Sequence, residues 1–332
     1  MGRYPEADLS RLAIRSVDER PTKVRVEDFA RPLDPGAAEA LLAALPRQLA
    51  AETLRAVVDR VVAARREGRP VVAMLGAHVV KVGVSPCLIA LVERGLVTHL
   101  AMNGATALHD VEIARSGRTS EDVESHLHEG RFGMVDETGD FMNAAMSEGN
   151  ARGEGLGECW GRALIETRAP HGDSSLLVAA YRHAVPATVH VAIGTDTIHH
   201  HPKCDGAALG ATTLRDFRIF AATLAEARGA VVLNLGSAVL MPEVFLKALS
   251  VARNLGADLS GLTTVNLDQI QHYRPRVNVV ERPTRGKGGQ GYALTGHHEI
   301  LIPILSAAIL ARAADAGIAR PAVGSPRGAR GA

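Results

Sequence analysis

Hydrophobic positions change their period repeatedly along the chain. They recur at about 3.6 residues from Leu54 to Arg66, form an unbroken run from Val71 to Leu75, return to a helical period, and then form a second run from Val97 to Met102. In the helix between these two runs, Ser85 can act as N-cap and Gly95 as the stop signal. This alternation is typical of βαβ units that build a parallel sheet.

The same order of elements returns in the second half of the chain. A helical pattern over Leu214–Gly229 leads into an apolar strand over Ala230–Gly236, and a helix opened by Pro242 and closed by Gly256 precedes the strand Gly261–Asp268. Two such halves predict an α/β fold with a doubly wound, mostly parallel, Rossmann-like sheet. We find no linker between the halves, so a single domain is expected.

The ends and the middle of the chain differ from this pattern. Residues 1–35 are charged and interrupted by proline, which predicts an N-terminal arm, and residues 312–332 read as a disordered tail. We therefore expect one domain over 36–311. Within it, 118–171 reads as a helical insertion, and Val185–Gly194 as a further strand whose lack of charge suggests a central position.

Composition excludes several classes of protein. The 37 Lys and Arg balance 36 Asp and Glu among 332 residues, and only 3% are aromatic, which argues against binding to nucleic acid. The charged N-terminus does not resemble a signal peptide, and no apolar run has the length of about 20 residues that spans a bilayer. Three widely spaced cysteines, Cys87, Cys159 and Cys204, argue against a disulfide framework. We expect a cytoplasmic protein that does not bind membranes.

Candidate chemistry lies in the loops after the predicted strands, because ligands of open parallel sheets bind at the carboxyl ends of the strands. Gly76, Gly104 and Gly236 follow strands directly and permit close approach of a phosphate to the backbone. Tight turns in any parallel sheet also need glycine, and none of these turns spells G-x-G-x-x-G.

The run His199–His201, with Asp196 before it and Cys204 and Asp205 after it, raises the question of a metal site. Neighbouring residues in extended chain point to opposite sides, and no spaced ligand motif is present. We therefore expect a hydrogen-bonded loop or an acid/base histidine, and no bound metal.

A glycine-rich segment, Glu281–Glu299, carries Lys287, Tyr292 and a pair of histidines. It could form a lid that closes over a substrate, or an exposed loop that leads into the apolar helix after Glu299. If Lys287 is buried on closure, its amine could act as a nucleophile.

The order of these pieces resembles deoxyhypusine synthase and its homologues over roughly Leu54–Leu310. The first unit of that family looks like the segment GRPVVAMLGAHVVKVGVSPCLIALVERGLVTHLAMNGATALHDVEIA. Its middle strand resembles PATVHVAIGTDTIHHHP, and its second unit is similar to AVVLNLGSAVLMPEVFLKALSVARNLGADLSGLTTVN. NGATALHDVE also resembles the Asn-x-x-Ala-x-His-Asp stretch of the NAD-dependent ornithine cyclodeaminase-like domain.

Both resemblances imply NAD as cofactor and a small amine, polyamine or amino acid as substrate, and the first implies a homotetramer. The implied catalytic residues are Lys287, His201, His109 and Glu281. The implied cofactor-binding residues are Gly76, His78, Asn103, Gly104, Ala105, Thr106, Asp110, Gly236, Ser237, Thr263, Thr264 and Asp268. The implied substrate-binding residues are Asp196, His200, His297, His298 and Glu299.

The chain also departs from the synthase pattern. Where that family has a lysine and paired histidines, this chain has Met241, Pro242 and Glu243. The tryptophan of the family's Glu-x-x-x-Trp-Gly-Lys pattern is also missing, because Arg285 stands two positions before Lys287. We expect an enzyme that removes hydride from a carbon bearing nitrogen and forms an imine, with aminoalkyl transfer through a lysine imine as one outcome. The alternatives are a deaminating or cyclising lyase acting on an amino acid such as ornithine, and a non-catalytic nucleotide-binding homologue.

Overall fold

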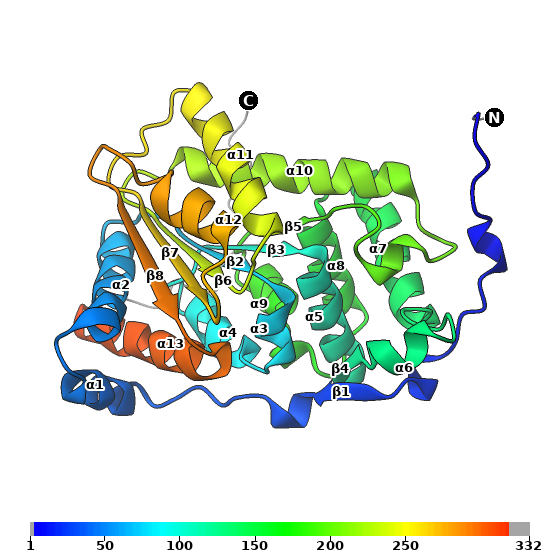
Figure 1. Cartoon of the computed structure of the whole chain (residues 1–332), viewed down its shortest axis with the longest axis horizontal. Coiled ribbons are helices and arrows are strands. Elements are labelled where there is room, and N and C mark those ends of the chain that lie inside the picture. The colour runs from blue at the N-terminus through cyan, green and yellow to red at the C-terminus, as the bar shows by residue number, and fades with distance from the viewer. Residues whose placement is uncertain (1–2, 319–332) are drawn as a thin grey trace.

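The computed structural model describes residues 3–318 and is built around a six-stranded, wholly parallel sheet (Figure 1). Its strands lie in the order β5-β3-β2-β6-β7-β8. Their bounds are β2 (Val71–Leu75), β3 (His99–Asn103), β5 (Ala187–His190), β6 (Val231–Leu235), β7 (Thr263–Asp268) and β8 (Gln290–Thr295). Numbered within the sheet, this is the order 3-2-1-4-5-6 of dinucleotide-binding Rossmann folds, with its reversal between β2 and β6.

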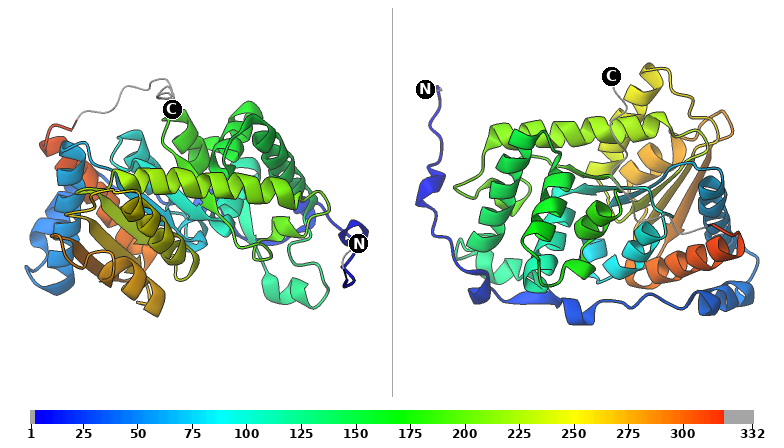
Figure 2. Two further views of the ribbon diagram at one scale, coloured as in Figure 1. Left: turned by 90° about the horizontal axis from the view of Figure 1, so that it is seen from above. Right: turned by 180° about the vertical axis from the view of Figure 1, so that it is seen from behind.

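Helices cover both faces of this sheet. Figure 1 shows α11 and α12 on one face, and the right view in Figure 2 shows the other face covered by helices that include α4, α9 and α13. The helices are α1 (Pro35–Ala44), α2 (Leu49–Arg66), α3 (Ala77–Lys81), α4 (Ser85–Glu93), α5 (Gly104–Ser116), α6 (Val123–Leu127), α7 (Asp136–Arg152), α8 (Leu156–Glu166), α9 (Leu176–Arg182), α10 (Gly206–Ala225), α11 (Leu240–Asn254), α12 (Tyr273–Pro275) and α13 (His298–Asp315). The doubly wound fold expected from the sequence is confirmed. None of the helices within residues 3–318 combines the length and apolar character needed to cross a membrane.

The alternation of side chains along β2 explains the two cores. Val71, Ala73 and Leu75 belong to the larger cluster under α2, α4, α5 and α13, whereas Val72 and Met74 belong to the cluster under α10 and α11. All five residues are buried, so the strand is apolar on both faces, as parallel strands between two helical layers are.

The strand β5 lies at an edge of the sheet, which corrects the expectation of a central position. Its residues are nevertheless shielded, because α8 and α10 pack against it and the Val189 backbone N–H donates to Asp216 Oδ2 at 2.7 Å. A side-chain acceptor and a helical cover therefore allow an uncharged strand to occupy an edge.

The N-terminal arm is ordered and runs along the outside of the molecule (Figure 1). Its strand β1 (Thr22–Arg25) pairs antiparallel with β4 (Arg118–Glu121), placing Val24 opposite Thr119. At the other end of the chain, α13 continues through Asp315, so the structure departs from a tail that begins at Arg312, and Arg312 binds Glu39. The remainder of the expected tail, from residue 319, lies outside the described residues.

Two buried histidines link the stability of the fold to pH. His99 and His190 both contact the Thr188 hydroxyl beneath Phe220, and burial lowers the pKa of each to about 3. The unfolded chain takes up these protons near pH 6.5. The neutral pair therefore stabilises the fold above pH 6.5, and this contribution is lost as pH falls toward 3.

We expect His190→Phe to remove one of these two titrations. Between pH 6 and pH 4, the free energy of unfolding of this variant should fall less steeply than that of the wild type. The difference between the two slopes should be about 1.4 kcal/mol per pH unit. Urea unfolding at several pH values measures the slope. His128→Gln, at an exposed histidine, should leave it unchanged, and an unaltered slope in His190→Phe would contradict the assignment.

Candidate functional site

The carboxyl ends of β2 and β6 meet at the reversal of the strand order, and those of β7 and β8 follow them along the same side of the sheet. We call Gly76, His78, Gly236, Asp268 and His298, which gather here, the switch-point cluster. The Gly76 N–H donates to Leu235 O at 2.9 Å, and a Cβ built on Gly76 would lie 2.1 Å from Gly236 O. The two turns therefore touch through their backbones, which only glycine at position 76 permits.

A pair of histidines spans this cluster. His78 Nδ1 lies 2.8 Å from His298 Nδ1, and His298 Nε2 lies 3.2 Å from Leu267 O and 3.8 Å from Asp268 Oδ1. A carbonyl oxygen only accepts, so His298 carries its proton on Nε2 and His78 donates from Nδ1. Burial, with His298 as a second cause, lowers the pKa of His78, so a neutral imidazole faces the end of β2.

A second group of polar residues lines a cavity of about 170 Å³ beside the first turn of α5. We call this cavity the side pocket. Its polar lining includes Arg20, Lys81, His109, Glu112, Ser120, Glu121, Thr195, Asp196 and Thr197. The five-residue helix α3 carries both His78 of the switch-point cluster and Lys81 of the side pocket, so the two groups adjoin.

Asp196 is the carboxylate of the side pocket that has an unsatisfied oxygen, and Arg20 in the same lining has two buried nitrogens, Nε and Nη2, without a partner among residues 3–318. The Asp196 side chain is buried, yet its Oδ2 has no hydrogen-bond partner among residues 3–318. A Cβ on Gly104 would lie 2.0 Å from this oxygen, so the glycine lets Asp196 sit against the start of α5. Burial raises the pKa of Asp196 to about 6.

His199 lies beside Asp196 and has a defined tautomer. Its Nδ1 accepts backbone N–H groups from Gly194 at 3.1 Å and from Asp196 at 3.3 Å, so its proton is on Nε2. That nitrogen lies 3.8 Å from Asp196 Oδ2 and has no hydrogen-bond partner in the described chain. The neighbouring His200 and His201 instead bind Gly133 O and Asp136.

Several expected site residues serve the fold instead. Asp110 is fully buried and accepts from Ser175 Oγ and from the N–H groups of Leu176 and Leu177, so it caps α9. Asn103 caps α5 by accepting from Thr106 N at 2.8 Å, and Ser237 accepts from Met241 N. The Asp110 carboxylate, the Asn103 side-chain oxygen and the Ser237 oxygen therefore already accept hydrogen bonds within the fold.

Other expected residues lie at the amino ends of the strands, on the side of the sheet opposite the carboxyl edge. The Lys287 carbonyl accepts from Gly261, which comes just before β7, so Lys287 marks the amino ends of β7 and β8. Glu281 precedes β8 and pairs with Arg276 and Arg285, and Thr263 and Thr264 begin β7. Residues 281–299 are therefore largely a turn and the strand β8. Within one chain Lys287 and Glu281 do not reach the carboxyl edge, because β8 separates them from it.

The remaining two residues flank the start of α13. His297 and Glu299 are exposed and lie 3.6 Å apart on the rim of the carboxyl edge. The sequence assigned no site role to Arg20, Lys81, Glu112 or Thr119, and it pointed to His199 only as part of the histidine run. Only Glu112 and His199 had a local signal, since Glu112 follows His109 by one helical turn and His199 belongs to the histidine run.

No group of three or more potential metal ligands comes together within residues 3–318. A scan of protein-family models and a search of curated proteins gave no match. Solved structures do match.

The structure of AgrE in a ternary complex with ornithine and NAD+ superposes with a TM-score of 0.50 at 16% identity, over 80% of this chain and 34% of AgrE. The likeness lies in the fold. ArgZ, an arginine dihydrolase from the ornithine–ammonia cycle in Cyanobacteria, gives 0.48 at 18% identity, over 79% of this chain and 33% of ArgZ. A putative deoxyhypusine synthase from Entamoeba histolytica gives 0.48 at 10% identity, over 89% and 100% of the two chains.

This chain spans about a third of the length of AgrE and ArgZ.

The contact between Gly236 and His298 can be tested by substitution. Gly236 has a φ of +70°, and a Cβ there would lie 2.8 Å from His298 Cε1, whereas Gly256 has a φ of +88° and open space around its Cβ position. Both Gly→Ala changes should cost about 1–2 kcal/mol for the left-handed backbone. Gly236→Ala should cost a further ~1 kcal/mol or more for the clash.

Urea unfolding of both variants in wild-type and His298→Ala backgrounds completes the measurement. Removing the imidazole should reduce the cost of Gly236→Ala to that of Gly256→Ala. Equal costs in the wild-type background would contradict the packing described here.

Proposed function

We propose that this protein is an NAD-dependent enzyme acting on a small amine or amino acid at the carboxyl edge of its sheet. The observation that carries the proposal is the reversal of strand order between β2 and β6, with a strand–glycine–helix turn on each side. This is where open α/β sheets bind dinucleotides. AgrE, which shares the fold, was crystallised with ornithine and NAD+.

The residues at the switch point fit a dinucleotide through α11. This 15-residue helix begins after the turn at Gly236, and the Val239 side chain does not cap it. Ser237 Oγ already accepts from the Met241 N–H at 3.2 Å and Pro242 has no N–H, so the Leu240 N–H and the helix dipole are what this end offers a pyrophosphate. Val239, Ile270 and Ile300 expose apolar side chains after β6, β7 and β8. When bound, NAD would accept hydride from the substrate carbon that bears nitrogen.

The side pocket supports the choice of substrate class. Arg20 pairs with Glu112, and Glu121 pairs with Arg15 and His126. Asp196 is left with only His199 nearby, and Lys81 has no charged partner within 4.0 Å among residues 3–318. Asp196 suits a substrate ammonium and Lys81 a carboxylate, so the pair fits an α-amino acid. His109 would take the proton that leaves the substrate nitrogen.

The placement of Lys287 favours a reaction without a lysine imine. A deaminating or cyclising reaction, in which an imine is hydrolysed or closed by a second amine, needs only the side-pocket residues and the cofactor. Release of ammonia from ornithine without an acceptor would support this reaction, and release of 1,3-diaminopropane from spermidine would instead support aminoalkyl transfer. The homotetramer, the cytoplasmic location and the remaining site roles stay predictions.

NAD binding is tested by thermal unfolding. A ligand that binds only the native state adds about 2.7 kcal/mol of stability at a hundredfold excess over its Kd, so the midpoint should rise by several degrees. Val239→Asp should abolish the rise, because its carboxylate lies at the N-terminus of α11 and repels phosphate, while Val239→Asn has the same size without the charge and should retain it. Wild-type protein that shows no rise with NAD, with or without ornithine, would refute the proposal.

Substrate binding should depend on the ionisation of Asp196. Because the pKa of Asp196 is about 6, the carboxylate is present above pH 6 and lost below it, so the Kd for ornithine should rise about tenfold for each pH unit below 6. Titration calorimetry from pH 5 to pH 8 with saturating NAD measures this. Asp196→Asn should bind weakly at every pH, and tighter binding of ornithine at pH 5 than at pH 7 would contradict the role.

A further inference from the structure

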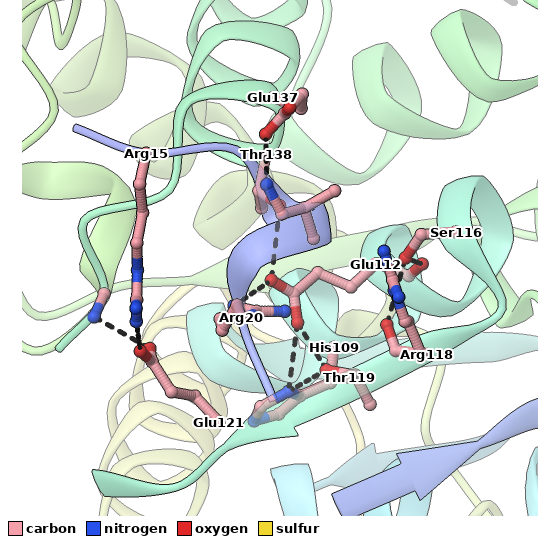
Figure 3. Close-up of polar contacts among 12 residues, drawn as sticks. Arg15, Arg20, His109, Glu112, Ser116, Arg118, Thr119, Glu121, Glu137 and Thr138 are labelled. Carbon is pink, nitrogen blue, oxygen red and sulfur yellow. Dashed lines mark hydrogen bonds and ion pairs between the residues drawn. The ribbon is translucent and has the colours of Figure 1, made fainter. Parts of the chain in front are cut away.

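A chain of polar contacts leads from the N-terminal arm to His109 (Figure 3). Arg20 Nη1 lies 2.8 Å from Glu112 Oε1, and the Thr119 hydroxyl donates to Glu112 Oε2. His109 Nδ1 lies 2.7 Å from Thr119 Oγ1. Glu112 and Thr119 are buried, and Arg20 is only 6% exposed, so water does not compete for these contacts.

The direction of each hydrogen bond follows from the available protons. Glu112 is ion-paired with Arg20 and accepts a further hydrogen bond from Thr138 Oγ1 at 3.2 Å, so both of its oxygens act as acceptors. A threonine hydroxyl has one proton, and that of Thr119 is directed to Glu112. Toward His109 the Thr119 oxygen can therefore only accept, and His109 must carry its proton on Nδ1.

The other nitrogen of His109 is then a free acceptor. Burial lowers the pKa of His109 to about 4, and the negative charge of Glu112, which raises this pKa, only partly offsets the effect of burial. The ring is therefore neutral near pH 7. A neutral imidazole with a proton on Nδ1 has a lone pair on Nε2. This nitrogen points away from Glu112 in Figure 3, and it forms no hydrogen bond with the described residues. The ring lines the side pocket together with Asp196.

The arrangement draws on three separate parts of the chain. Pairing of β1 with β4 brings Thr119 next to the arm, and Arg20 lies two residues before β1. A buried ion pair of this kind adds little net stability compared with apolar packing, because both charges are desolvated. Its effect on the orientation and protonation of His109 is more specific.

We propose that Arg20, Glu112 and Thr119 are positioning residues that hold the proton of His109 on Nδ1 and present Nε2 to the side pocket as a proton acceptor. The use of that acceptor in catalysis rests on the proposed function. The state of the imidazole does not, because it is fixed in the protein without ligands.

The proposal is tested by ¹⁵N NMR of the histidine side chains in the full-length protein at pH 7, with His109→Gln used to assign the signals. In the wild type, His109 should show a protonated Nδ1 and an unprotonated Nε2. Thr119→Val keeps the shape and removes the acceptor, so the ratio of the two tautomers should shift by about fivefold or more toward protonated Nε2. Thr119→Ser keeps the hydroxyl and should restore the wild-type spectrum.

Glu112→Gln provides a second route if Thr119→Val does not fold. Its amide can donate to Thr119, which frees the hydroxyl proton to face His109, so protonated Nε2 should increase here as well. A wild-type His109 protonated on Nε2, or a tautomer unchanged in folded Thr119→Val or Glu112→Gln, would overturn the proposal. Failure to bind NAD would refute the proposed function and leave this result intact.

Discussion

The contact between the turns at Gly76 and Gly236 is the constraint on which the carboxyl edge depends. Parallel pairing of β2 with β6 places the ends of both strands side by side, and the Gly236 carbonyl fills the space that a side chain at position 76 would need. Because the turns close on each other, the loop after β2 can carry His78 across to α13. The histidine pair is therefore a product of backbone packing.

Most charged side chains around the side pocket form ion pairs with one another, and only a few have no charged partner within the described residues. Arg15 is paired with Glu121 and Arg20 with Glu112 in the network beside β4 (Figure 3). His126 also pairs with Glu121. Asp196 faces the cavity with one oxygen unsatisfied, and Lys81 remains at the mouth. A buried carboxylate without a partner is costly for the fold, which is why its neutral form is favoured up to about pH 6. Such a cost is typical of groups retained for a ligand.

The sequence predicted the layers of the fold well because apolar periodicity reports local burial. The runs at Val71–Leu75 and Ala230–Gly236 became adjacent central strands, β2 and β6, with helices on both faces. It misplaced β5, since an uncharged strand looks the same in the middle of a sheet and at an edge covered by α8 and α10. The order of strands in the sheet depends on contacts between segments far apart in the sequence, and the apolar pattern along the chain carries no information about those contacts.

The candidate site was only partly predictable for the same reason. Position after a strand drew attention to His78 and Asp196, which lie in the switch-point cluster and in the side pocket. The resemblance assigned Asp110 and Asn103 to a ligand, but the hydrogen bonds of their carboxylate and amide groups are decided by tertiary contacts with α9 and within α5. Lys287 looked reactive beside its glycines, yet the sheet puts β8 between it and the carboxyl edge. Arg20 lies in an arm without a hydrophobic pattern, and only its pairing with Glu112 reveals its importance.

The hydrogen bond from Val189 N–H to Asp216 affects whether a further strand can pair with β5. A strand added beside β5 would need that N–H as its first ladder donor, and Asp216 already holds it, while α8 and α10 fill the adjoining space. The sheet is thereby limited to six strands on this side. A neighbouring chain that approached β5 would find this donor occupied and the adjoining space filled by α8 and α10, which disfavours β-type association at this edge strand.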